Sequence, residues 1–326
     1  MVYKMNIKYL LKKLSHAIIT IFFVIVFNYV LFRLLPGDPV RMLSRNPKIT
    51  PEALESIKRL FGLDLPWYKQ FFVYINNLFH GNLGMSFTFK VPVTTVMSAR
   101  LWPTLVLLVT SEIFSVLIGL IVGTVAAWKR GKKADLGAMG FSLIMYSMPT
   151  FWLGMLMVAI FSVQLHLYPT GGMLTPGMSY ADFGAAFSDF ARHLFLPLAV
   201  LVLNYIAEYA ITMRNTMTDI LSEDYITTAK AKGFSNPYIL RRHALPNAML
   251  PVTTIVMMNL GYVVAGSIEV ETIFSWPGLG RLMYEAIFMR DYPLLQGVFL
   301  LVTICVVVAN FLADITYVYL DPRVSY

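Results

Sequence analysis

The stretch Ser222-Glu-Asp-Tyr-Ile-Thr-Thr-Ala-Lys-Ala-Lys-Gly-Phe-Ser-Asn-Pro-Tyr-Ile-Leu-Arg-Arg-His-Ala-Leu-Pro246 decides how this chain is interpreted, because it is polar and basic and lies between long apolar segments. A segment this polar in so apolar a chain is expected to lie in water. Its residues predict two short helices. Ser222 caps the first, and Gly233 ends it in a left-handed turn. Asn236 caps the second, Pro237 lies in its first turn, and Leu245–Pro246 ends it before the next apolar segment. We expect the first helix, thin and capped, to enter a groove on another protein and to move as a rigid body.

The composition predicts an all-α polytopic membrane protein. The chain has 326 residues, of which 57% are hydrophobic and 13% are charged, whereas soluble domains carry about 25% charged residues. The net charge of +8 is also compatible with nucleic-acid binding. We prefer the simpler explanation that Lys and Arg gather in the short loops on one side of the membrane. We therefore expect the chain to contact membrane lipid and not to bind nucleic acid.

Six apolar segments are long enough to span a bilayer, which takes about 20 helical residues. The basic residues at their ends predict that both termini are cytoplasmic. In the third segment we expect Pro149 to kink the helix, and either a neighbouring helix or Ser147 to satisfy the freed carbonyl. The predicted spans are Ala17–Leu35, Leu101–Trp128, Met139–Leu165, Leu194–Met213, Ala248–Ile268 and Leu294–Tyr319.

These spans divide the chain into four parts. Residues 1–35 hold the cytoplasmic N-terminus and the first helix, and residues 36–98 form an extracytoplasmic helical loop. In that loop one helix is expected to start at Thr50–Glu52, and a second, amphipathic helix follows Pro66 and is broken at Gly81 and Gly84. Residues 99–320 form a five-helix transmembrane domain that includes the cytoplasmic loop 215–246, and residues 321–326 form a cytoplasmic tail.

The sequence lacks the motifs expected of an ATP-binding loop, a disulfide or a metal site. No Gly-x-x-x-x-Gly-Lys-Ser/Thr loop occurs, so any ATPase is expected to be another subunit. The single cysteine, Cys305, has no partner in the chain for a disulfide, and the five histidines are scattered, which makes a metal site improbable. Glu112 lies well inside a span, where a charge is costly, so we expect it to face a partner or a wet cavity, and we favour a structural partner on a neighbouring helix over contact with substrate.

The quoted stretch resembles the coupling loop of ABC importer permeases, whose general pattern is Glu-Ala-Ala, three residues, Gly, nine residues, Ile, one residue, Leu-Pro. Here Thr227–Ala229 is followed by three residues and Gly233, and nine residues later by His243–Pro246. Thr, Thr and His replace the Glu, the first Ala and the Ile. Glu223–Gly233 looks like the version in dipeptide/oligopeptide permeases, and the chain most resembles the first permease subunit of such systems. Similar signatures lie at Leu35–Pro39, Gly62–Pro66, Gly81–Ser86, Ser147–Trp152 and Glu271–Gly280.

This resemblance implies a type I ABC importer permease fold and a non-enzymatic subunit that forms half of the translocation pathway. It implies a second homologous permease subunit, two ATPase subunits that bind ATP and Mg, and an extracytoplasmic binding protein, in the cell membrane of a prokaryote. The implied cargo is a dipeptide or oligopeptide. Relatives carry other solutes, so the cargo could instead be a nickel chelate, glutathione or an oligosaccharide. The less favoured alternative is a different class of protein, an ion-coupled secondary transporter.

Two sets of residues are candidates for function. On the coupling loop, the resemblance implies that one set contacts the ATPase subunit: Tyr225, Thr228, Ala229, Lys230, Gly233, Phe234, Leu245 and Pro246. In the spans, the polar residues Asn204 and Glu208 lie four apart on one helical face. Candidates for lining the pathway are Asn204, Glu208, Asn259 and Tyr262, although bonds between helices would explain each of them equally well.

Overall fold

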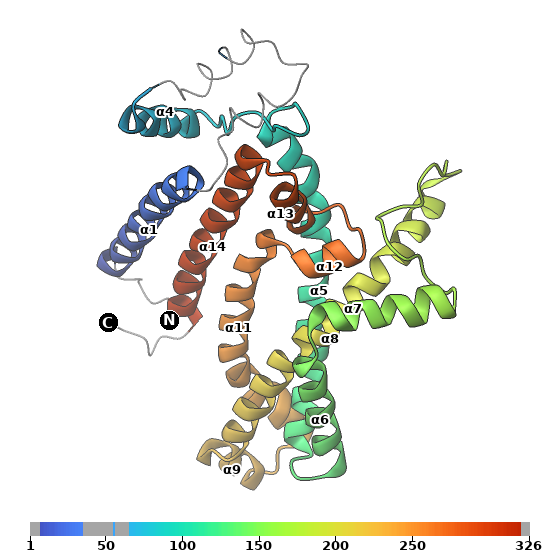
Figure 1. The fold of residues 1–326 in the computed structure, drawn as a ribbon. Helices are drawn as coiled ribbons and strands as arrows, with labels where there is room; N and C mark the ends of the chain where they lie inside the picture. The colour runs from blue at the N-terminus through green and yellow to red at the C-terminus, as the bar shows by residue number, and fades with distance from the viewer. Residues whose placement is uncertain (1–6, 35–54, 56–64, 321–326) are drawn as a thin grey trace.

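The computed structural model describes residues 7–34, 55 and 65–320, and all regular elements among them are helical (Figure 1). The α-helices are α1 (Ile7–Leu34), α4 (Trp67–Phe79), α5 (Val93–Trp128), α6 (Lys133–Ser147), α7 (Thr150–Met157), α8 (Phe183–Leu221), α9 (Asp224–Ala231), α10 (Asn236–Ile239), α11 (Leu245–Tyr262), α12 (Ile268–Ile273), α13 (Leu279–Phe288) and α14 (Tyr292–Leu320). Two π-helical segments, η1 (Val158–Gln164) and η2 (Leu240–Ala244), and one 3₁₀ segment, η3 (Val263–Ala265), join them.

The described residues contain five helices long and apolar enough to cross a membrane, and a sixth span if one bent pair is counted as a span. This agrees with the predicted all-α polytopic membrane protein. The five are Lys8–Phe32, Val93–Trp128, Phe183–Leu221, Asn236–Ala265 and Tyr292–Thr316, and the bent pair is Lys133–Ser147 with Thr150–Gln164. The predicted division into four parts stays a prediction.

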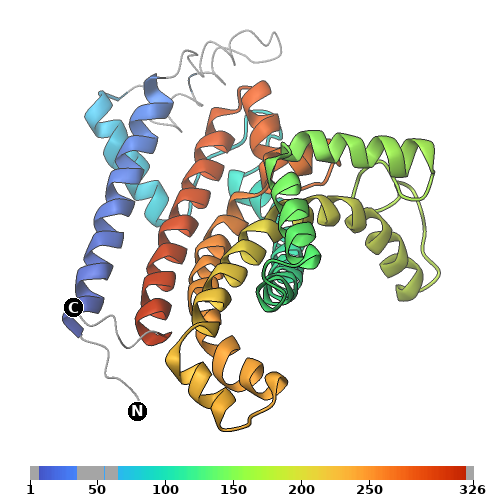
Figure 2. The same cartoon turned by 90° about the horizontal axis from the view of Figure 1, so that it is seen from below.

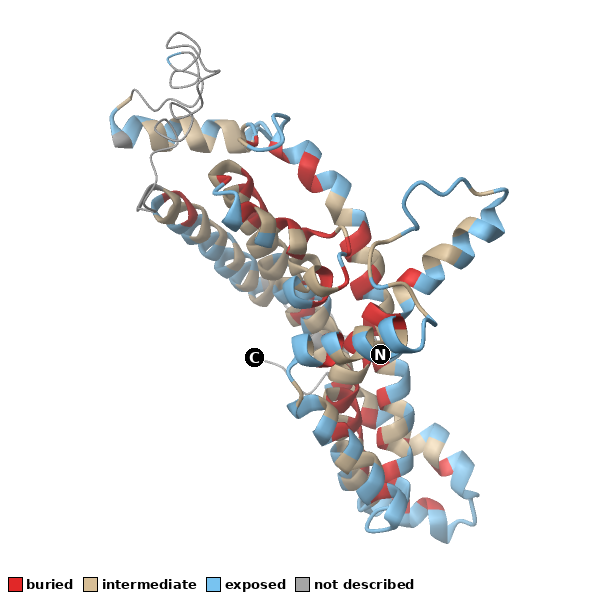
Figure 3. Ribbon diagram, turned by 45° about the vertical axis from the view of Figure 1, so that its right-hand side comes forward, coloured by how far each residue is buried: buried red, intermediate tan, exposed pale blue. Residues whose placement is uncertain are grey.

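The spans form an open bundle with a distinct group of elements at each end. Helix α4 lies across one end of α1, and α9 lies at the opposite end of the molecule (Figure 1). Helices α1 and α14 run side by side, and α7 with the start of α8 projects away from the bundle (Figure 2). Buried residues gather toward the centre, while the outlying helices are mostly exposed (Figure 3). The exposed face of α1 carries large apolar side chains, among them Phe22, Phe23 and Phe27, as expected of a helix that contacts lipid.

Helices α5 and α8 pack so closely that they leave no room for a side chain between them. A Cβ atom added at Gly119 would lie 2.4 Å from the Cβ of Tyr209, and one at Gly123 would lie 2.5 Å from the carbonyl oxygen of Ala210. In a membrane, apolar side chains gain little by leaving lipid, so close backbone approach at small residues is a main source of helix association. These two glycines therefore fix how α5 crosses α8.

The third predicted span is not a kinked helix but two helices meeting at a sharp bend. Helices α6 and α7 are separated by a break of 99°. Met148 is extended, with φ −77° and ψ 128°, because a residue before proline is driven out of the α region. Pro149 then precedes the first turn of α7. The Ser147 hydroxyl donates to the carbonyl of Leu143 at 2.8 Å, so its predicted role at the proline is wrong.

Two loops predicted outside the spans are partly helical. Helix α8 begins at Phe183 rather than near Leu194, because Asp182 caps it: its carboxylate accepts a hydrogen bond from the backbone N–H of Ala185 at 2.8 Å. The amphipathic helix expected after Pro66 is confirmed as α4, and Gly81 and Gly84 follow it with φ of 69° and 86°. The helix expected at Thr50–Glu52 lies outside the described residues.

A buried carboxylate organises the α4 end of the bundle. Glu271 is fully buried and accepts hydrogen bonds from the Thr104 hydroxyl and the Arg281 backbone N–H, both at 2.9 Å. The Thr104 hydroxyl in turn accepts the backbone N–H of Leu279 at 2.7 Å. Burial raises the pKa of the Glu271 carboxyl, and the hydrogen bonds act in the opposite direction. Trp276, also fully buried, donates from Nε1 to the carbonyl of Pro103 at 2.9 Å, so α12 and α13 are fastened to α5.

We expect Gly119→Ala to destabilise the protein by about 1–3 kcal/mol, because the new methyl group overpacks the α5–α8 contact. Thermal unfolding of the purified protein, followed by size-exclusion chromatography, measures the loss. Gly137→Ala is the matched control: nothing lies within 4 Å of a Cβ at Gly137 of α6, so it should be neutral or slightly stabilising. Equal behaviour of the two variants would contradict the close crossing.

We expect Thr104→Val to cost about 1–3 kcal/mol, because it leaves the Leu279 N–H and the Glu271 carboxyl without their shared partner. The control is Thr110→Val on the same helix, since the Thr110 hydroxyl donates only to the Val106 carbonyl of its own helix. Thermal unfolding of both variants should show a larger loss for Thr104→Val, and a loss confined to Thr110→Val would refute the bridging role.

Candidate functional site

Packing, rather than capping, holds α9 in place. Ser222 does not cap α9 as predicted: it ends α8, and its hydroxyl donates to the Asp219 carbonyl at 2.6 Å. Glu223 stands at the N-cap without a side-chain hydrogen bond. Instead, Ile226 and Ala229 are buried in a cluster shared by α5, α8, α9, α10, η2 and α11. The helix is therefore fixed along its length by its apolar face.

The predicted end of α9 is confirmed. Gly233 has φ +81°, and its N–H donates to the Lys230 carbonyl at 2.9 Å. The N–H of Phe234 donates to the Ala229 carbonyl at 3.3 Å. Nothing lies within 4 Å of a Cβ built at Gly233, so the turn faces open space.

The second predicted helix does not end where expected. Pro237 lies in the first turn of α10 as predicted, but Ser235, not Asn236, stands at the N-cap. The chain then continues through η2 directly into α11, so Leu245–Pro246 lies at the start of α11, inside the candidate span Asn236–Ala265, instead of ending a helix. Pro246 is tolerated because it lies in the first turn of α11, where its missing N–H is not needed.

Helices α9 and α10 with the turn between them form a hairpin, residues 224–239. Its exposed side carries an aromatic patch, which we define as Tyr225, Phe234 and Tyr238. Their exposed fractions are 41%, 43% and 46%. The Phe234 and Tyr238 rings stack with centroids 4.8 Å apart, and Asn247 donates to the Tyr225 hydroxyl at 3.3 Å. Sequence reasoning missed Tyr238, although its spacing of four from Phe234 was a usable signal. Aromatic side chains this exposed beside basic residues can serve as anchors for another protein.

The structure sorts the eight predicted contact residues into two groups. Ala229 is buried and Leu245 is half-buried, so both face the chain's own core. The remaining six are exposed, the last of them at the start of α11 and the others on the hairpin: Tyr225, Thr228, Lys230, Gly233, Phe234 and Pro246.

A bidentate ion pair ties α8 to the turn between α5 and α6. Arg214 donates from Nε and Nη2 to the two carboxylate oxygens of Asp135, both at 2.8 Å, and Asp135 is buried. The N–H of Gly131 also donates to Asp135, at 2.9 Å. Paired guanidinium and carboxylate groups hold a fixed relative geometry. This pair was not predicted, because nothing in the sequence brings α6 beside α8.

A chain of hydrogen bonds links α5, α8 and α11 within the spans. The buried Tyr209 hydroxyl donates to Glu112, which confirms the expected partner on a neighbouring helix. Asn259 donates from Nδ2 to the Tyr209 hydroxyl at 2.8 Å and to Glu208 at 3.2 Å. We call Glu112, Tyr209, Asn259 and Glu208 the polar network.

The polar network contains two of the four predicted pathway residues. Glu208 and Asn259 bond each other, and Asn204, one turn from Glu208, donates to the Met148 carbonyl at 3.4 Å. Tyr262 is exposed one turn along α11 from Asn259. Sequence reasoning missed Tyr209, because a tyrosine inside a long apolar helix gives no signal of its own.

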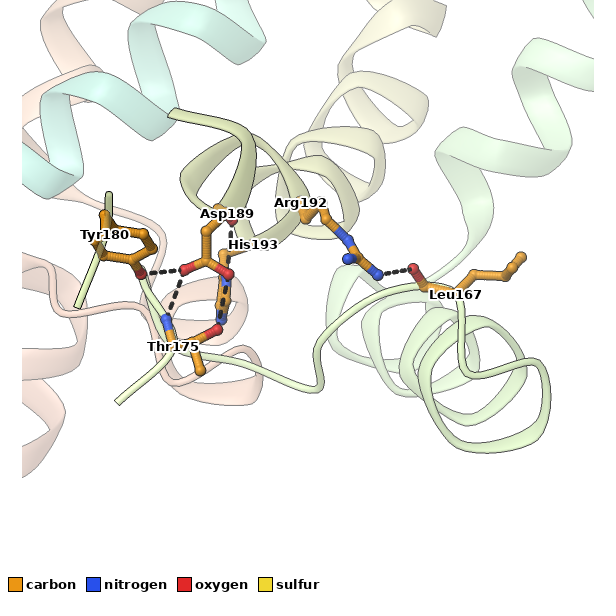
Figure 4. A network of polar contacts seen from close by, with 6 residues as sticks. All are labelled: Leu167, Thr175, Tyr180, Asp189, Arg192 and His193. Carbon is orange, nitrogen blue, oxygen red and sulfur yellow. Dashed lines mark hydrogen bonds and ion pairs between the residues drawn. The ribbon is translucent and has the colours of Figure 1, made fainter. Parts of the chain in front are cut away.

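A second network of hydrogen bonds holds the loop between η1 and α8 in place (Figure 4). Asp189 accepts hydrogen bonds from the Thr175 N–H and hydroxyl, both at 2.7 Å, and from the Tyr180 hydroxyl at 2.6 Å. Arg192 donates to the Leu167 carbonyl at 3.2 Å. These bonds lie within the projecting arm, so they fix the loop's shape rather than the spans.

An open groove of about 670 Å³ lies at the bend between α6 and α7. Two lining side chains carry polar groups: Ser147, whose hydroxyl bonds its own helix, and Trp152, whose indole N–H is a donor. The rest of the lining is apolar, so the groove offers a polar solute few hydrogen-bonding groups. In the described part of the chain, no three His, Cys, Asp or Glu residues lie together as a metal site would require.

Comparisons with known proteins match nearly the whole length of the chain. Residues 115–326 match the family described as binding-protein-dependent transport system inner membrane component, and residues 6–109 match its N-terminal region. The glutathione transport system permease protein GsiC of Escherichia coli is 36% identical over 320 residues, which cover 98% of this chain and 99% of the relative. The di/tripeptide transport system permease protein DppB of Pseudomonas aeruginosa is 38% identical over 334 residues, again with 98% and 99% coverage.

The fold is also known from solved structures. A chain of the inward-facing MetNI methionine ABC transporter superposes with a TM-score of 0.56 at 20% identity, covering 70% of this chain and 97% of that one. A chain of an amino acid ABC transporter gives a TM-score of 0.51 at 16% identity. At these identities the likeness shows the fold alone.

We expect Asp135→Asn to destabilise the protein by about 3 kcal/mol, because it leaves the Arg214 guanidinium without its buried partner. Thermal unfolding measures the loss. The matched control is Asp314→Asn, which breaks the more exposed Lys13–Asp314 pair at 2.7 Å and should cost less than about 1 kcal/mol. A larger loss for the control would contradict the structural role of the buried pair.

Proposed function

We propose, on the premise that the chain belongs to the binding-protein-dependent transport system inner membrane components, that it carries short peptides across the membrane. The chain is a non-catalytic, multi-pass inner membrane permease subunit of an ABC importer, and ATP is bound by partner ATPase subunits. The observation that carries the peptide proposal is the full-length similarity to relatives named for di/tripeptide and glutathione transport. Glutathione is itself a tripeptide, so both names describe one chemical class.

The α9 end of the bundle is the cytoplasmic end in this proposal, and both termini lie on that side. Support comes from the basic residues that gather there, including Lys129, Arg130, Lys230 and Arg241. The opposite end, with α4, then faces the binding protein that delivers the peptide.

The aromatic patch and its neighbours Thr228, Lys230 and Pro246 contact the ATPase subunit in this proposal. They are exposed, while the apolar side of α9 is buried against α8 and α11. Ala229 and Leu245 then act from within, by holding the hairpin in position. A push on α9 passes into both spans through side-chain packing, because Ile226 and Ala229 are buried together with residues of α8 and α11.

The pathway runs along the polar side of α8 and α11 in this proposal, between this chain and a second homologous permease subunit. Asn204, Glu208, Asn259 and Tyr262 face it. Asn204, Glu208 and Asn259 are half-buried and Tyr262 is exposed, and polar side chains at bilayer depth need water or a partner.

We expect Gly233→Trp to leave membrane insertion intact and to abolish association with the ATPase subunits. The indole would project from the exposed turn, where it meets nothing in this chain but blocks a docking partner. Pull-down of the ATPase from membrane extracts measures the effect.

The control for this variant is Gly233→Ala, which imposes the same backbone strain at positive φ without the bulk, and which should retain most of the association. Recovery of the ATPase at wild-type levels with Gly233→Trp would show that the hairpin does not dock there.

Uptake by the reconstituted importer tests the cargo. We expect the complex of this chain with its partner permease, ATPases and binding protein to take up labelled dialanine in proteoliposomes when ATP is supplied. Glutathione, a nickel chelate and a maltodextrin serve as competitors. If only glutathione competes, the cargo is glutathione or a close analogue of it. If the nickel chelate or the sugar is taken up and dialanine is not, the peptide proposal is overturned.

A further inference from the structure

Glu208 is bonded within the polar network, but its carboxylate can still accept further hydrogen bonds. One carboxylate oxygen, Oε2, accepts a hydrogen bond from Asn259 at 3.2 Å. The other oxygen accepts none from the described residues, and no described Lys, Arg or His pairs with the carboxylate. The side chain is half-buried in α8, at the depth of the spans. A carboxylate has room for about four hydrogen bonds, so most of its capacity is free.

The network's other members already join the helices without Glu208. Tyr209 and Glu112 link α8 to α5, and Asn259 and Tyr209 link α11 to α8. Holding the three spans together therefore does not require a fourth, charged member. An intramembrane carboxylate without a compensating charge is costly, so it is expected where it meets water or a cation.

The network also fixes how the carboxylate is presented. The Tyr209 proton is directed to Glu112, so the hydroxyl oxygen is free to accept one N–H of Asn259. This orients the amide with its nitrogen toward α8, and the second N–H reaches Glu208. Without Tyr209 the amide is free to turn its oxygen toward the carboxylate, which would repel it.

Glu208 further belongs to a polar stripe on α8. Asn204, Glu208, Thr212 and Asn215 follow one another at spacings of four, four and three, which places them on one helical face. The stripe runs from the middle of the span to its α9 end. A polar stripe along a span is expected to border a wet passage rather than lipid.

We propose that Glu208 accepts the ammonium group of the transported peptide, and that Asn259 and Tyr209 are positioning residues that aim its carboxylate. This rests on the proposed function in naming the cargo a peptide. The α-amino group of a peptide is largely protonated near neutral pH and supplies both the charge and the donors that Glu208 lacks. The polar network then selects solutes by one end of the molecule and tolerates any side chain.

The test uses the assembled importer in nanodiscs, without binding protein or nucleotide. The probes are two dipeptides with a diazirine side chain, one with a free amine and one N-acetylated, in choline buffer. After irradiation, labelling of this subunit is measured. We expect the wild type to be labelled about tenfold more by the free amine, as one charge-assisted hydrogen bond provides. Glu208→Gln should abolish the preference, and Tyr209→Phe should reduce it while Glu208 is still present.

Glu285→Gln is the matched control, because this carboxylate of α13 is paired with Arg281 at 2.8 Å and lies outside the network. It should keep the full preference. A wild type without preference, or a Glu208→Gln variant that retains it, overturns the proposal, and the wild-type result decides even if the variant fails to assemble. Loss of the preference in sodium buffer would reveal an inorganic cation site and would also overturn it. An unchanged preference in Tyr209→Phe refutes the positioning role.

Uptake of dialanine by the complete wild-type importer separates the two proposals. Uptake without an amine preference would refute only the assignment to Glu208. Failure of all peptide uptake would refute the proposed function itself.

Discussion

The close crossing of α5 and α8 is the constraint on which the rest of this structure depends. Gly119 and Gly123 let the two backbones meet where no Cβ atom would fit. Only at that separation does Tyr209 reach Glu112 across the contact. The same approach brings the start of α6 beside α8, where Asp135 binds Arg214 in two parallel hydrogen bonds. Small residues at one crossing thus allow both polar ties, and in lipid these ties count because hydrophobic burial contributes little.

Helix α8 carries this constraint from the projecting arm to the α9 end of the molecule. It runs unbroken from Phe183 in the arm to Leu221 beside the hairpin of α9 and α10. The hairpin is packed onto it through Ile226 and Ile239, both fully buried, and it continues without a joint into α11. A force on the aromatic patch therefore reaches the polar network through packed helices. The proposed coupling needs such a packed unit, because coupling requires contacts that differ between the two states of the partner ATPase.

The sequence was most informative where a residue's conformational limits act locally. Gly233 ends α9 in a left-handed turn, and the amphipathic spacing after Pro66 predicts α4, because both depend on neighbours along the chain. Predictions failed where tertiary geometry decides. Pro149 separates two helices at a sharp bend instead of kinking one, and Pro246 lies in the first turn of α11 instead of closing a helix. The partners of Arg214 and Asn259 lie on other helices, so no local pattern reveals them.

The rigidity of the α8–α9 unit is the claim tested most directly by a distance measurement. Spin labels at Phe187→Cys and Thr227→Cys, in a Cys305→Ser background, report the length of this unit by pulsed electron resonance in the assembled importer; Thr227 is exposed on α9 and lies outside the proposed ATPase-contact set. The account predicts the same mean distance in the nucleotide-free complex and in a complex trapped with ATP and vanadate, once trapping has been verified by loss of ATPase activity. A shift of that distance on trapping would show a joint between α8 and α9 and would contradict the account.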